Sequence, residues 1–219
     1  MMMKMSLTKD ELLNYLAKQL DVFFPDGTPL DRDGLARHLP IVLERMEFCF
    51  SRIGNRYFFD GSSVLFNHLH ADQYAMFLYL TSHALYRGGA DVRTCDKIFH
   101  LNRLLHGIDA FYEVDLPDIF LFVHPLGTVL GRGRYADYFL VYQRCGIGSN
   151  RNIYPTLDRF VTLRPGSSIL GNCHIGENCT MAAGACILDR DLEANSVYMG
   201  NPMNHRIRGK NEKPAIWRI

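Results

Sequence analysis

Histidine and cysteine are among the side chains of this chain that could move a proton, attack a substrate or bind a metal. The sequence of 219 residues contains 9 histidines and 6 cysteines. His124, which precedes Pro125, occupies the second place of a six-residue repeat, where side chains point outward. A neutral imidazole there can act as a general base that accepts the proton of an attacking hydroxyl group. Without further support, the position also suits an ordinary surface histidine.

The other histidines and the cysteines do not favour a metal centre. His68 and His70 form an HxH pair, but two residues this far apart do not share a helix face. The sequence has no CxxC pair, and Cys145, Cys173 and Cys179 take repeat positions that call for a slim buried side chain. We therefore expect reduced core cysteines, no disulfide framework and no metal.

A six-residue rhythm fills the last hundred residues. Every sixth residue from 157 to 187 is large and apolar, and the residue four places after each of the first five is slim. The large residues are Leu157, Leu163, Ile169, Ile175, Met181 and Ile187, and the slim ones are Val161, Ser167, Cys173, Cys179 and Ala185. A second register runs upstream through Val123, Val129, Tyr135, Val141, Ile147 and Ile153. Such hexads form the sides of a triangular coil with about eighteen residues per turn, which predicts a parallel β-helix.

The rhythm is interrupted once and then ends. The register changes between Ile153 and Leu157, where Pro155 fits a protruding loop, and such loops often contact ligands. The repeat ends after Val197, and Gly200-Asn-Pro202 leads the chain away from the coil. We expect residues 203–219 to form an irregular tail whose first part is basic.

The first part of the chain has helical spacing. Thr8 and Glu11 form a capping-box pattern before a helix that ends at Pro25. Further helices are expected at about 31–53, where Pro40 divides the helix or opens its second part, at 64–86 and at 91–111. The prediction is an α+β chain with an α-helical domain at 1–113, a β-helix at 114–202 and a C-terminal tail at 203–219.

Composition excludes several partner classes. The formal net charge is +1, so no broad basic surface for nucleic acid is expected. The mean hydropathy is −0.08, no apolar run reaches the length of a membrane span, and the first residues lack the apolar core of a signal peptide. We expect a cytoplasmic protein with no membrane partner.

Six ordered segments resemble serine O-acetyltransferases, which belong to the hexapeptide acyltransferase superfamily. The resemblance extends over about 64–210. The segments are 79–88 (YLTSHALYRG), 114–117 (VDLP), 124–131 (HPLGTVLG), 141–143 (VYQ), 154–157 (YPTL) and 168–172 (SILGN). The resemblance implies a left-handed parallel β-helix, assembled as a homotrimer or a dimer of trimers because each outward face offers half a cleft. It also implies direct transfer of an acetyl group from acetyl-CoA, as co-substrate, to a small hydroxyl-bearing acceptor.

The resemblance implies roles for particular residues. His124 would be the general base and Asp115 the residue that orients it, with Asp118 as a local rival. Tyr154, Gln143 and Asp60 would contact the acceptor. Small residues would let the pantetheine arm approach the backbone, and basic residues would meet the coenzyme phosphates. The small residues are Pro165, Gly166, Ala183 and Gly184, and the basic ones are Arg208 and Lys210.

Three departures from the family pattern all concern the acceptor. Val123 replaces the aspartate that precedes the family histidine, Tyr154 replaces a second histidine, and the segment between Asp115 and His124 is about one hexad short. Serine is the default acceptor, and the alternative is a sugar or nucleotide-sugar hydroxyl or amine in surface-polysaccharide synthesis. A second alternative is a non-catalytic scaffold or partner-binding protein. The terminal Ile219 resembles the residue with which serine acetyltransferases bind O-acetylserine sulfhydrylase.

Overall fold

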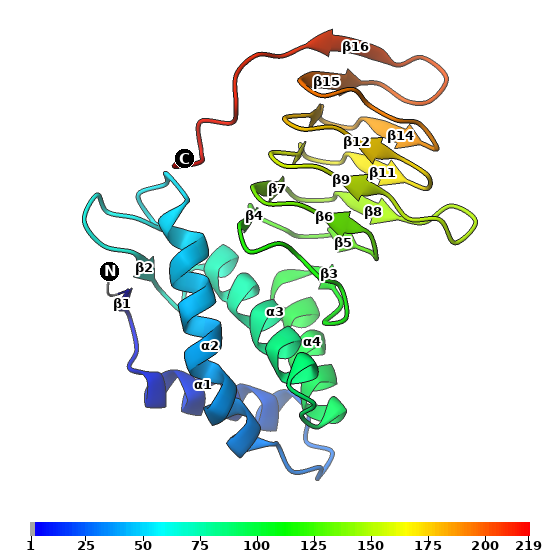
Figure 1. The fold of residues 1–219 in the computed structure, drawn as a ribbon. Coiled ribbons are helices and arrows are strands. Elements are labelled where there is room, and N and C mark those ends of the chain that lie inside the picture. The colour runs from blue at the N-terminus through cyan, green and yellow to red at the C-terminus, as the bar shows by residue number, and fades with distance from the viewer. Residues whose placement is uncertain (1–2) are drawn as a thin grey trace. The chain divides into compact units, whose positions relative to one another are not determined.

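The computed structural model describes residues 3–219, so Met1 and Met2 of the expected helical domain lie outside the described residues. The chain divides into two compact units (Figure 1). The helical unit comprises the residues up to His106, with 111–113 and Arg218. The solenoid unit comprises 107–110, 114–217 and Ile219.

Four helices form the first unit: α1 (Lys9–Phe23), α2 (Arg32–Ser51), α3 (Ala71–Arg87) and α4 (Val92–His106). A short strand β1 (Lys4–Met5) pairs in parallel with β2 (Leu65–Phe66). The predicted capping box is confirmed, because the Glu11 amide donates to the Thr8 hydroxyl and the Thr8 amide donates to the Glu11 carboxylate. Helix α3 is buried over most of its length and packs against α2 and α4. None of the helices within residues 3–219 combines the length and apolar character that a membrane span requires.

Three predicted helix boundaries are wrong. Helix α2 continues through Pro40, whose exposed ring interrupts one backbone bond while Leu39, Val42 and Leu43 keep the helix packed on the core. The helix expected from residue 64 begins only at Ala71, because Leu65–Phe66 is used as a strand. The last helix ends at His106 instead of 111, because Gly107 adopts a positive φ of 63° and leads the chain into the solenoid.

Three sheets form the second unit, and the chain visits them in turn; every strand pair in them is parallel except β15 with β16. Sheet 1 contains β4 (Phe120–Phe122), β7 (Phe139–Val141), β10 (Thr162–Leu163), β13 (Thr180–Met181), β15 (Ser196–Met199) and β16 (Arg206–Gly209). Sheet 2 contains β3 (Asp109–Ala110), β5 (Val129–Leu130), β8 (Gly146–Gly148), β11 (Ser168–Leu170) and β14 (Cys186–Leu188). Sheet 3 contains β6 (Arg134–Tyr135), β9 (Thr156–Leu157) and β12 (His174–Ile175). We call the turns from sheet 1 to sheet 2 corner 1, from sheet 2 to sheet 3 corner 2, and from sheet 3 to sheet 1 corner 3.

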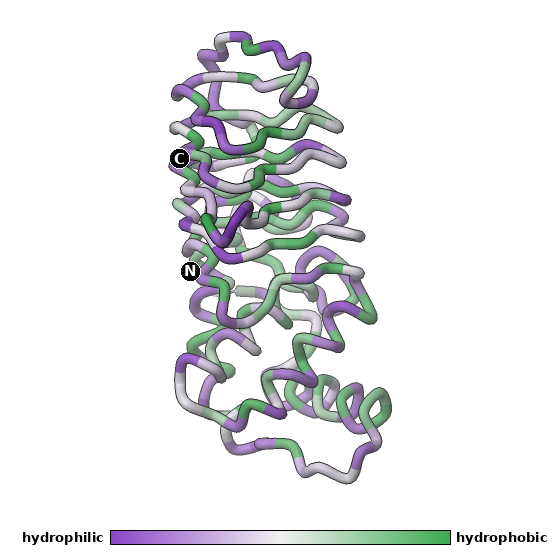
Figure 2. The backbone as a smooth tube through the Cα atoms, turned by 90° about the vertical axis from the view of Figure 1, so that its right-hand side faces the viewer, coloured by the Kyte–Doolittle hydropathy of each residue, from purple (hydrophilic) through white to green (hydrophobic). Residues whose placement is uncertain are grey.

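The hexad register explains the solenoid core. Every large residue of the register that begins at Leu157 is buried, and so are the slim residues that follow them. Strand pairing aligns Phe122, Val141, Leu163, Met181 and Tyr198 in one buried column. Apolar segments recur from coil to coil along the solenoid (Figure 2). The predicted helical domain followed by a parallel β-helix is confirmed.

The upstream register is only partly right. Tyr135, Val141 and Ile147 align with the core columns as predicted. Val129 and Ile153 are each 49% exposed, and Leu130 and Phe122 take the inward places expected for Val129 and Val123. The cause is irregular turn length: Phe122 and Leu130 are eight positions apart, and Ile147 and Leu157 are ten apart, instead of six.

The loop predicted beside Pro155 and the tail also differ in detail from expectation. The extra residues after β8 form a loop that is closed by the bridge between Asn150 and Ile153, and the buried Pro155 follows it. Part of the tail is regular, because β16 pairs antiparallel with β15 and ends the solenoid.

Candidate active site

Corner 1 stacks turns of similar conformation on successive coils. Gly127, Arg144, Gly166 and Gly184 occupy equivalent places with φ of 72°, 55°, 75° and 70°. Backbone hydrogen bonds join each turn to the next: Arg144 N donates to Leu126 O (2.9 Å), Gly166 N to Gln143 O (3.0 Å) and Gly184 N to Pro165 O (2.9 Å). We call residues 124–127, 143–144, 165–166 and 183–184 the corner column. It brings together six residues predicted from sequence: His124, Gln143, Pro165, Gly166, Ala183 and Gly184.

His124 lies in the longest turn of the column. Five positions separate the buried Phe122 from Gly127, whereas three separate Val141 from Arg144 in the next coil. The two extra residues form a bulge in which His124 is exposed and adopts a φ of 48°, while its carbonyl accepts from Leu126 N at 2.8 Å. A left-handed backbone costs a non-glycine residue roughly 1–2 kcal/mol. Conformations of this kind concentrate at functional sites.

Gln143 occupies the turn one coil above His124. Its side-chain carbonyl oxygen is buried and has no hydrogen-bond partner within residues 3–219. A buried acceptor left without a donor costs about 1–3 kcal/mol. A ligand that carries a hydroxyl or amine would remove this cost by donating to the amide.

The upper part of the column is a narrow strip of backbone. Ala183 and Gly184 are exposed, and a Cβ added at Gly184 would meet no atom within 4 Å. A Cβ at Gly166 would approach only the Gly184 backbone, at 3.8 Å. Glycine is therefore present for its positive φ, and the space beside the strip stays open to an extended ligand.

Sequence reasoning missed the two arginines of this edge. Arg144 is an exposed member of the column, and Arg164 precedes Pro165. The Arg164 guanidinium donates to the Tyr142 hydroxyl at 3.1 Å and lies 5.2 Å from the centre of the Tyr142 ring. Their signal was a basic residue at the same corner of two successive coils, and only Arg164 stands directly beside a proline.

Asp115 and Asp118 lie beside a cavity at corner 3. The cavity has a volume of 430 Å³, and Asp137 and Arg159 also line it. It is found where β4 and β7 begin, since Ile119 N donates to the Asp137 carboxylate at 3.1 Å and Tyr138 N donates to Ile119 O at 2.7 Å. His124 follows the other end of β4. The predicted pairing of His124 with Asp115 therefore stays a prediction.

Tyr154 belongs to corner 2. It is 38% exposed and follows the loop that leads from β8 to β9. One side of the triangle holds about six residues, or roughly 20 Å at about 3.3 Å per residue. Within one chain, Tyr154 and His124 are thus on different edges of the solenoid.

Asp60 and Lys210, which the sequence analysis placed in the site, make hydrogen bonds to other parts of the chain. Asp60 lies in the helical unit, where its carboxylate accepts from the amides of Ser62 and Ser63 at 2.9 and 2.7 Å and from Lys4 Nζ at 3.1 Å. These bonds hold the pKa of Asp60 far below its usual range. Lys210 Nζ donates to the Thr180 hydroxyl at 3.0 Å, and burial lowers the pKa of Lys210.

Arg208 and Lys210 lie at different places along the end of the solenoid. Arg208 is exposed in the middle of β16, where it pairs with Val197. The Lys210 amide donates to Asn195 O at corner 3, the opposite end of β15 from corner 1. Arg206, which pairs with Met199, lies at the end of β15 nearer the corner column.

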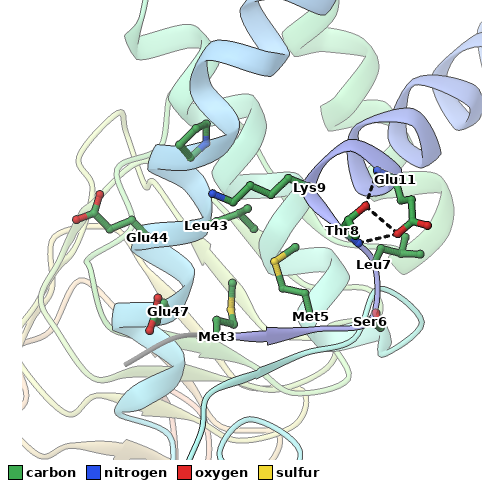
Figure 3. A pocket seen from close by; sticks show the side chains of 11 residues that line it. Met3, Met5, Ser6, Leu7, Thr8, Lys9, Glu11, Leu43, Glu44 and Glu47 are labelled. Atoms are coloured by element: carbon green, nitrogen blue, oxygen red, sulfur yellow. Dashed lines mark hydrogen bonds between the residues drawn. The ribbon is translucent and has the colours of Figure 1, made fainter.

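Within residues 3–219, no group of three or more histidine, cysteine or acidic side chains could hold a metal ion. A cavity of 620 Å³ lies between α2 and the segment that leads into α1 (Figure 3). Met3, Met5 and Leu43 form its apolar wall, and Thr8 and Glu11 are engaged in the capping box.

The chain was compared with known protein families, curated proteins and solved structures. No family model matches the chain. A serine acetyltransferase of Synechococcus elongatus is 33% identical over 108 residues, which are 47% of this chain and 44% of that protein. In this region the chain is similar in sequence to serine acetyltransferases. A further relative, from Schizosaccharomyces pombe, is 25% identical over 134 residues, or 59% of this chain and 49% of the relative. The chain spans about half the length of the curated relatives it matches.

Solved serine acetyltransferases share the fold. The crystal structure of the Brucella abortus enzyme in complex with coenzyme A matches 95% of this chain and 85% of its own, with a TM-score of 0.69 and 18% identity. The left-handed β-helix of hexapeptide repeats and the resemblance to serine acetyltransferases, both predicted from sequence, are thereby confirmed.

Proposed function

We propose that this chain is an acetyl-CoA-dependent O-acetyltransferase of the serine acetyltransferase type. The observation that carries the proposal is the corner column, in which an exposed histidine on an extended turn stands below an open strip of small residues. The homology to serine acetyltransferases supports the same reaction, and the solved Brucella abortus homologue is a complex with coenzyme A.

In the proposed reaction, His124 acts as the general base. Its neutral imidazole takes the proton of the acceptor hydroxyl while that oxygen attacks the carbonyl carbon of the thioester. The new C–O bond replaces the C–S bond, and the proton passes from the imidazole to the departing sulfur, which leaves as coenzyme A thiol. Such proton transfer contributes about 10²–10⁴-fold in rate. Asp115, with Asp118 as its rival, is proposed to orient the imidazole.

The donor is proposed to lie along the column. Pro165, Gly166, Ala183 and Gly184 would meet the pantetheine arm, since the space beside Gly184 is open. Arg208 remains a candidate for the phosphates, and we add Arg144 and Arg164 because both flank the strip. We remove Lys210 from this role, because its ammonium group already donates to Thr180 and Asn178.

The acceptor is proposed to be serine, with a sugar hydroxyl or amine as the second candidate. The buried amide oxygen of Gln143 favours any acceptor that carries a donor beside its reacting hydroxyl. Tyr154 offers a hydroxyl in place of a cationic imidazole, and this substitution favours an acceptor without a carboxylate. Asp60 is left out of the proposed site because its oxygens cap a turn.

The complete site is proposed to need more than one copy of the chain. His124, Tyr154 and Asp115 lie on three different corners of one solenoid, so a corner of a second copy would have to complete the cleft. A homotrimer or a dimer of trimers satisfies this requirement. Sulfhydrylase binding is proposed through Ile219, whose side chain is 76% exposed. A cytoplasmic location is proposed because all six cysteines, which lie within the described residues, are unpaired.

The test is a thiol-release assay with acetyl-CoA, first with L-serine and then with amino sugars and nucleotide-sugars. We expect turnover of one acceptor that is lost in His124→Ala and kept in His174→Ala, because His174 is also an exposed solenoid histidine but pairs with Asp158 at 3.0 Å. Turnover of a sugar alone would identify the second candidate. Coenzyme A binding without turnover of any acceptor would favour the scaffold alternative and contradict the proposal.

A further inference from the structure

Arg144 places a permanent positive charge in the corner column at a position that favours glycine. The equivalent places in the other coils hold Gly127, Gly166 and Gly184, which adopt this backbone without strain. Arg144 has a φ of 55°, a conformation that its Cβ makes unfavourable. Strained residues of this kind concentrate at functional sites. The arginine is therefore present at a cost to stability, although glycine would satisfy the backbone of the turn.

The side chain of Arg144 begins over the turn that contains His124. Arg144 N donates to Leu126 O at 2.9 Å, so the two turns are stacked directly. A Cβ added at Gly127 would lie 3.4 Å from Arg144 Cγ and 3.8 Å from Arg144 Cα, so the side chain leans over Gly127. Neighbouring strands of a sheet are about 4.8 Å apart. Arg144 thus stands one coil away from the turn of the proposed base.

The charge of Arg144 is available to a ligand. No residue of the corner column is an aspartate or glutamate. Within residues 3–219, the guanidinium group of Arg144 takes part in no hydrogen bond, ion pair or ring contact, whereas Arg164 in the next coil is engaged with Tyr142. The neighbouring residue, Gln143, has a buried amide oxygen without a partner in the same part of the chain. One turn therefore offers both a cation and a hydrogen-bond acceptor.

The place of Arg144 along the column matches the acceptor better than the coenzyme phosphates. The reacting sulfur must lie near His124, and the whole pantetheine arm separates that sulfur from the phosphates. A donor that runs along the open strip takes its phosphates toward Gly184, away from Arg144. Arg144 therefore leaves the set of phosphate candidates, in which Arg164 and Arg208 remain.

We propose that Arg144 is a specificity-determining residue that pairs with an anionic group of the acceptor, a carboxylate or a phosphate. Guanidinium groups bind both through charge-assisted hydrogen bonds. The acceptor hydroxyl lies at His124, and a second donor of the acceptor bonds to Gln143. Arg144 supplies the positive charge that the phenol of Tyr154 cannot offer. The inference rests on the proposed transferase function and excludes neutral sugars as acceptors.

Two pairs of acceptors test this role in the thiol-release assay, because the members of each pair differ in one anionic group. L-serine is compared with L-serinamide, and glucosamine 1-phosphate with glucosamine. We expect one anionic acceptor to have a kcat/KM at least about tenfold above that of its neutral partner. The pair that shows this preference identifies the group as carboxylate or phosphate. Equal turnover within a pair would overturn the inference and leave the transferase function intact. Turnover of none of the four would also overturn it, while the wider acceptor panel decides the transferase function separately.

Three variants assign the preference to Arg144. Arg144→Gln removes the charge and should raise the KM for the anionic acceptor about tenfold or more, with the KM for acetyl-CoA and the turnover of the neutral partner unchanged. Arg144→Lys keeps the charge and should recover part of the preference. Arg93→Gln, at an exposed arginine of α4, is the matched control and should leave both KM values unchanged. A rise in the KM for acetyl-CoA alone would assign Arg144 to the coenzyme phosphates and contradict the inference.

Arg144→Gly separates a binding role from a structural one. Glycine adopts a φ of 55° without strain, so this variant should unfold at no lower temperature than the unaltered chain while it loses the preference for the anionic acceptor. Thermal unfolding and steady-state kinetics on the same preparation measure both properties. A lower unfolding temperature together with an unchanged acceptor preference would give Arg144 a structural role instead.

Discussion

Corner 1 and corner 3 of the solenoid share a left-handed backbone conformation but differ in the size of the side chains that adopt it. At corner 1 the left-handed positions hold Gly127, Arg144, Gly166 and Gly184, and the space beside the strip is open. At corner 3 the equivalent positions hold Tyr138, Phe160, Asn178 and Asn195, with φ of 65°, 63°, 60° and 58°. Asparagine tolerates this region, but for an aromatic residue it is an outlier.

Side-chain contacts compensate for the unusual residues of corner 3. The Tyr138 and Phe160 rings stack with centroids 4.3 Å apart, and Asn178 donates to Asn195 at 2.8 Å. The C-terminal segment covers the stack: Lys213 Nζ lies 4.2 Å from the Phe160 ring centre, and Trp217 meets Tyr138 edge-on at 5.5 Å. A corner built with stacked rings is closed, whereas a corner built with glycine leaves its backbone accessible. The difference leaves the backbone of corner 1 open on the side where we propose that the donor lies.

The largest expected effect comes from the open corner. His124→Ala should lower kcat by about 10²–10⁴-fold, because the base that removes the acceptor proton is lost. Thermal unfolding should change little, since the side chain is exposed. Steady-state kinetics with the accepted substrate checks the prediction, and a variant that keeps more than half of its kcat would show that His124 is not the base.

The closed corner should respond in stability instead. Phe160 is 1% exposed, and Phe160→Ala should lower the free energy of unfolding by about 3 kcal/mol through loss of burial and ring stacking. Phe160→Asn should be less destabilising, because asparagine accepts the left-handed backbone and continues the Asn178 ladder. Chemical denaturation measures both. Trp217 is the single tryptophan, so its fluorescence should shift to longer wavelength if the cover over Tyr138 is loosened.

A smaller effect is expected where glycine lines the open strip. Gly184→Ala should cost about 1 kcal/mol of stability because φ is 70°. The methyl group would also stand beside the proposed pantetheine path, so KM for acetyl-CoA should rise several-fold with kcat nearly unchanged. Gly209→Ala, at a glycine outside the column with no atom within 4 Å of its added Cβ, is the matched control. An unchanged KM in Gly184→Ala would place the donor elsewhere.

The sequence predicted the parts of the molecule that depend on repetition. Regular hexads predicted the buried residues from Leu157 to Ile187, because a residue about eighteen positions later repeats the same environment one coil further on, as Met181 does for Leu163. The predictions failed where a turn changes length, as at Val129 and Ile153, since an insertion shifts every later side chain to another face. Aromatic left-handed residues such as Phe160 have no local signal, because their compensation comes from Tyr138 in another coil and from Lys213 in the C-terminal segment.

The candidate site, like the fold, was predictable where it depends on the repeat and not where it depends on individual side-chain contacts. Six of the residues that the resemblance implied share corner 1, because the repeat of about eighteen residues returns the chain to the same edge. Asp60 and Lys210 were chosen by type and approximate location, and side-chain contacts that no spacing reveals engage both of them. The roles of His124, Asp115 and Tyr154 depend on how corners of separate chains meet, which lies beyond the hexad pattern.

The smallest expected effect is a pH dependence of stability at His106, the last residue of α4. His106 precedes Gly107, whose carbonyl accepts from Gly127 N at 2.9 Å. Burial lowers the pKa of His106 to about 4 from its ordinary value of 6.5, and its Nε2 is buried without a hydrogen-bond partner within residues 3–219. The unfolded chain therefore binds a proton between these values that the folded chain does not.

Stability from this group is fully present above pH 6.5 and is lost as the pH falls toward 4. His106→Gln should flatten this part of the stability profile, leaving only the slope due to carboxylates. Denaturation at pH 7, 6, 5 and 4 measures it, with His174→Gln as the exposed control. A slope unchanged by His106→Gln would mean that another group takes up the proton. A flattened slope would identify a histidine whose protonation weakens the chain where it enters the open corner.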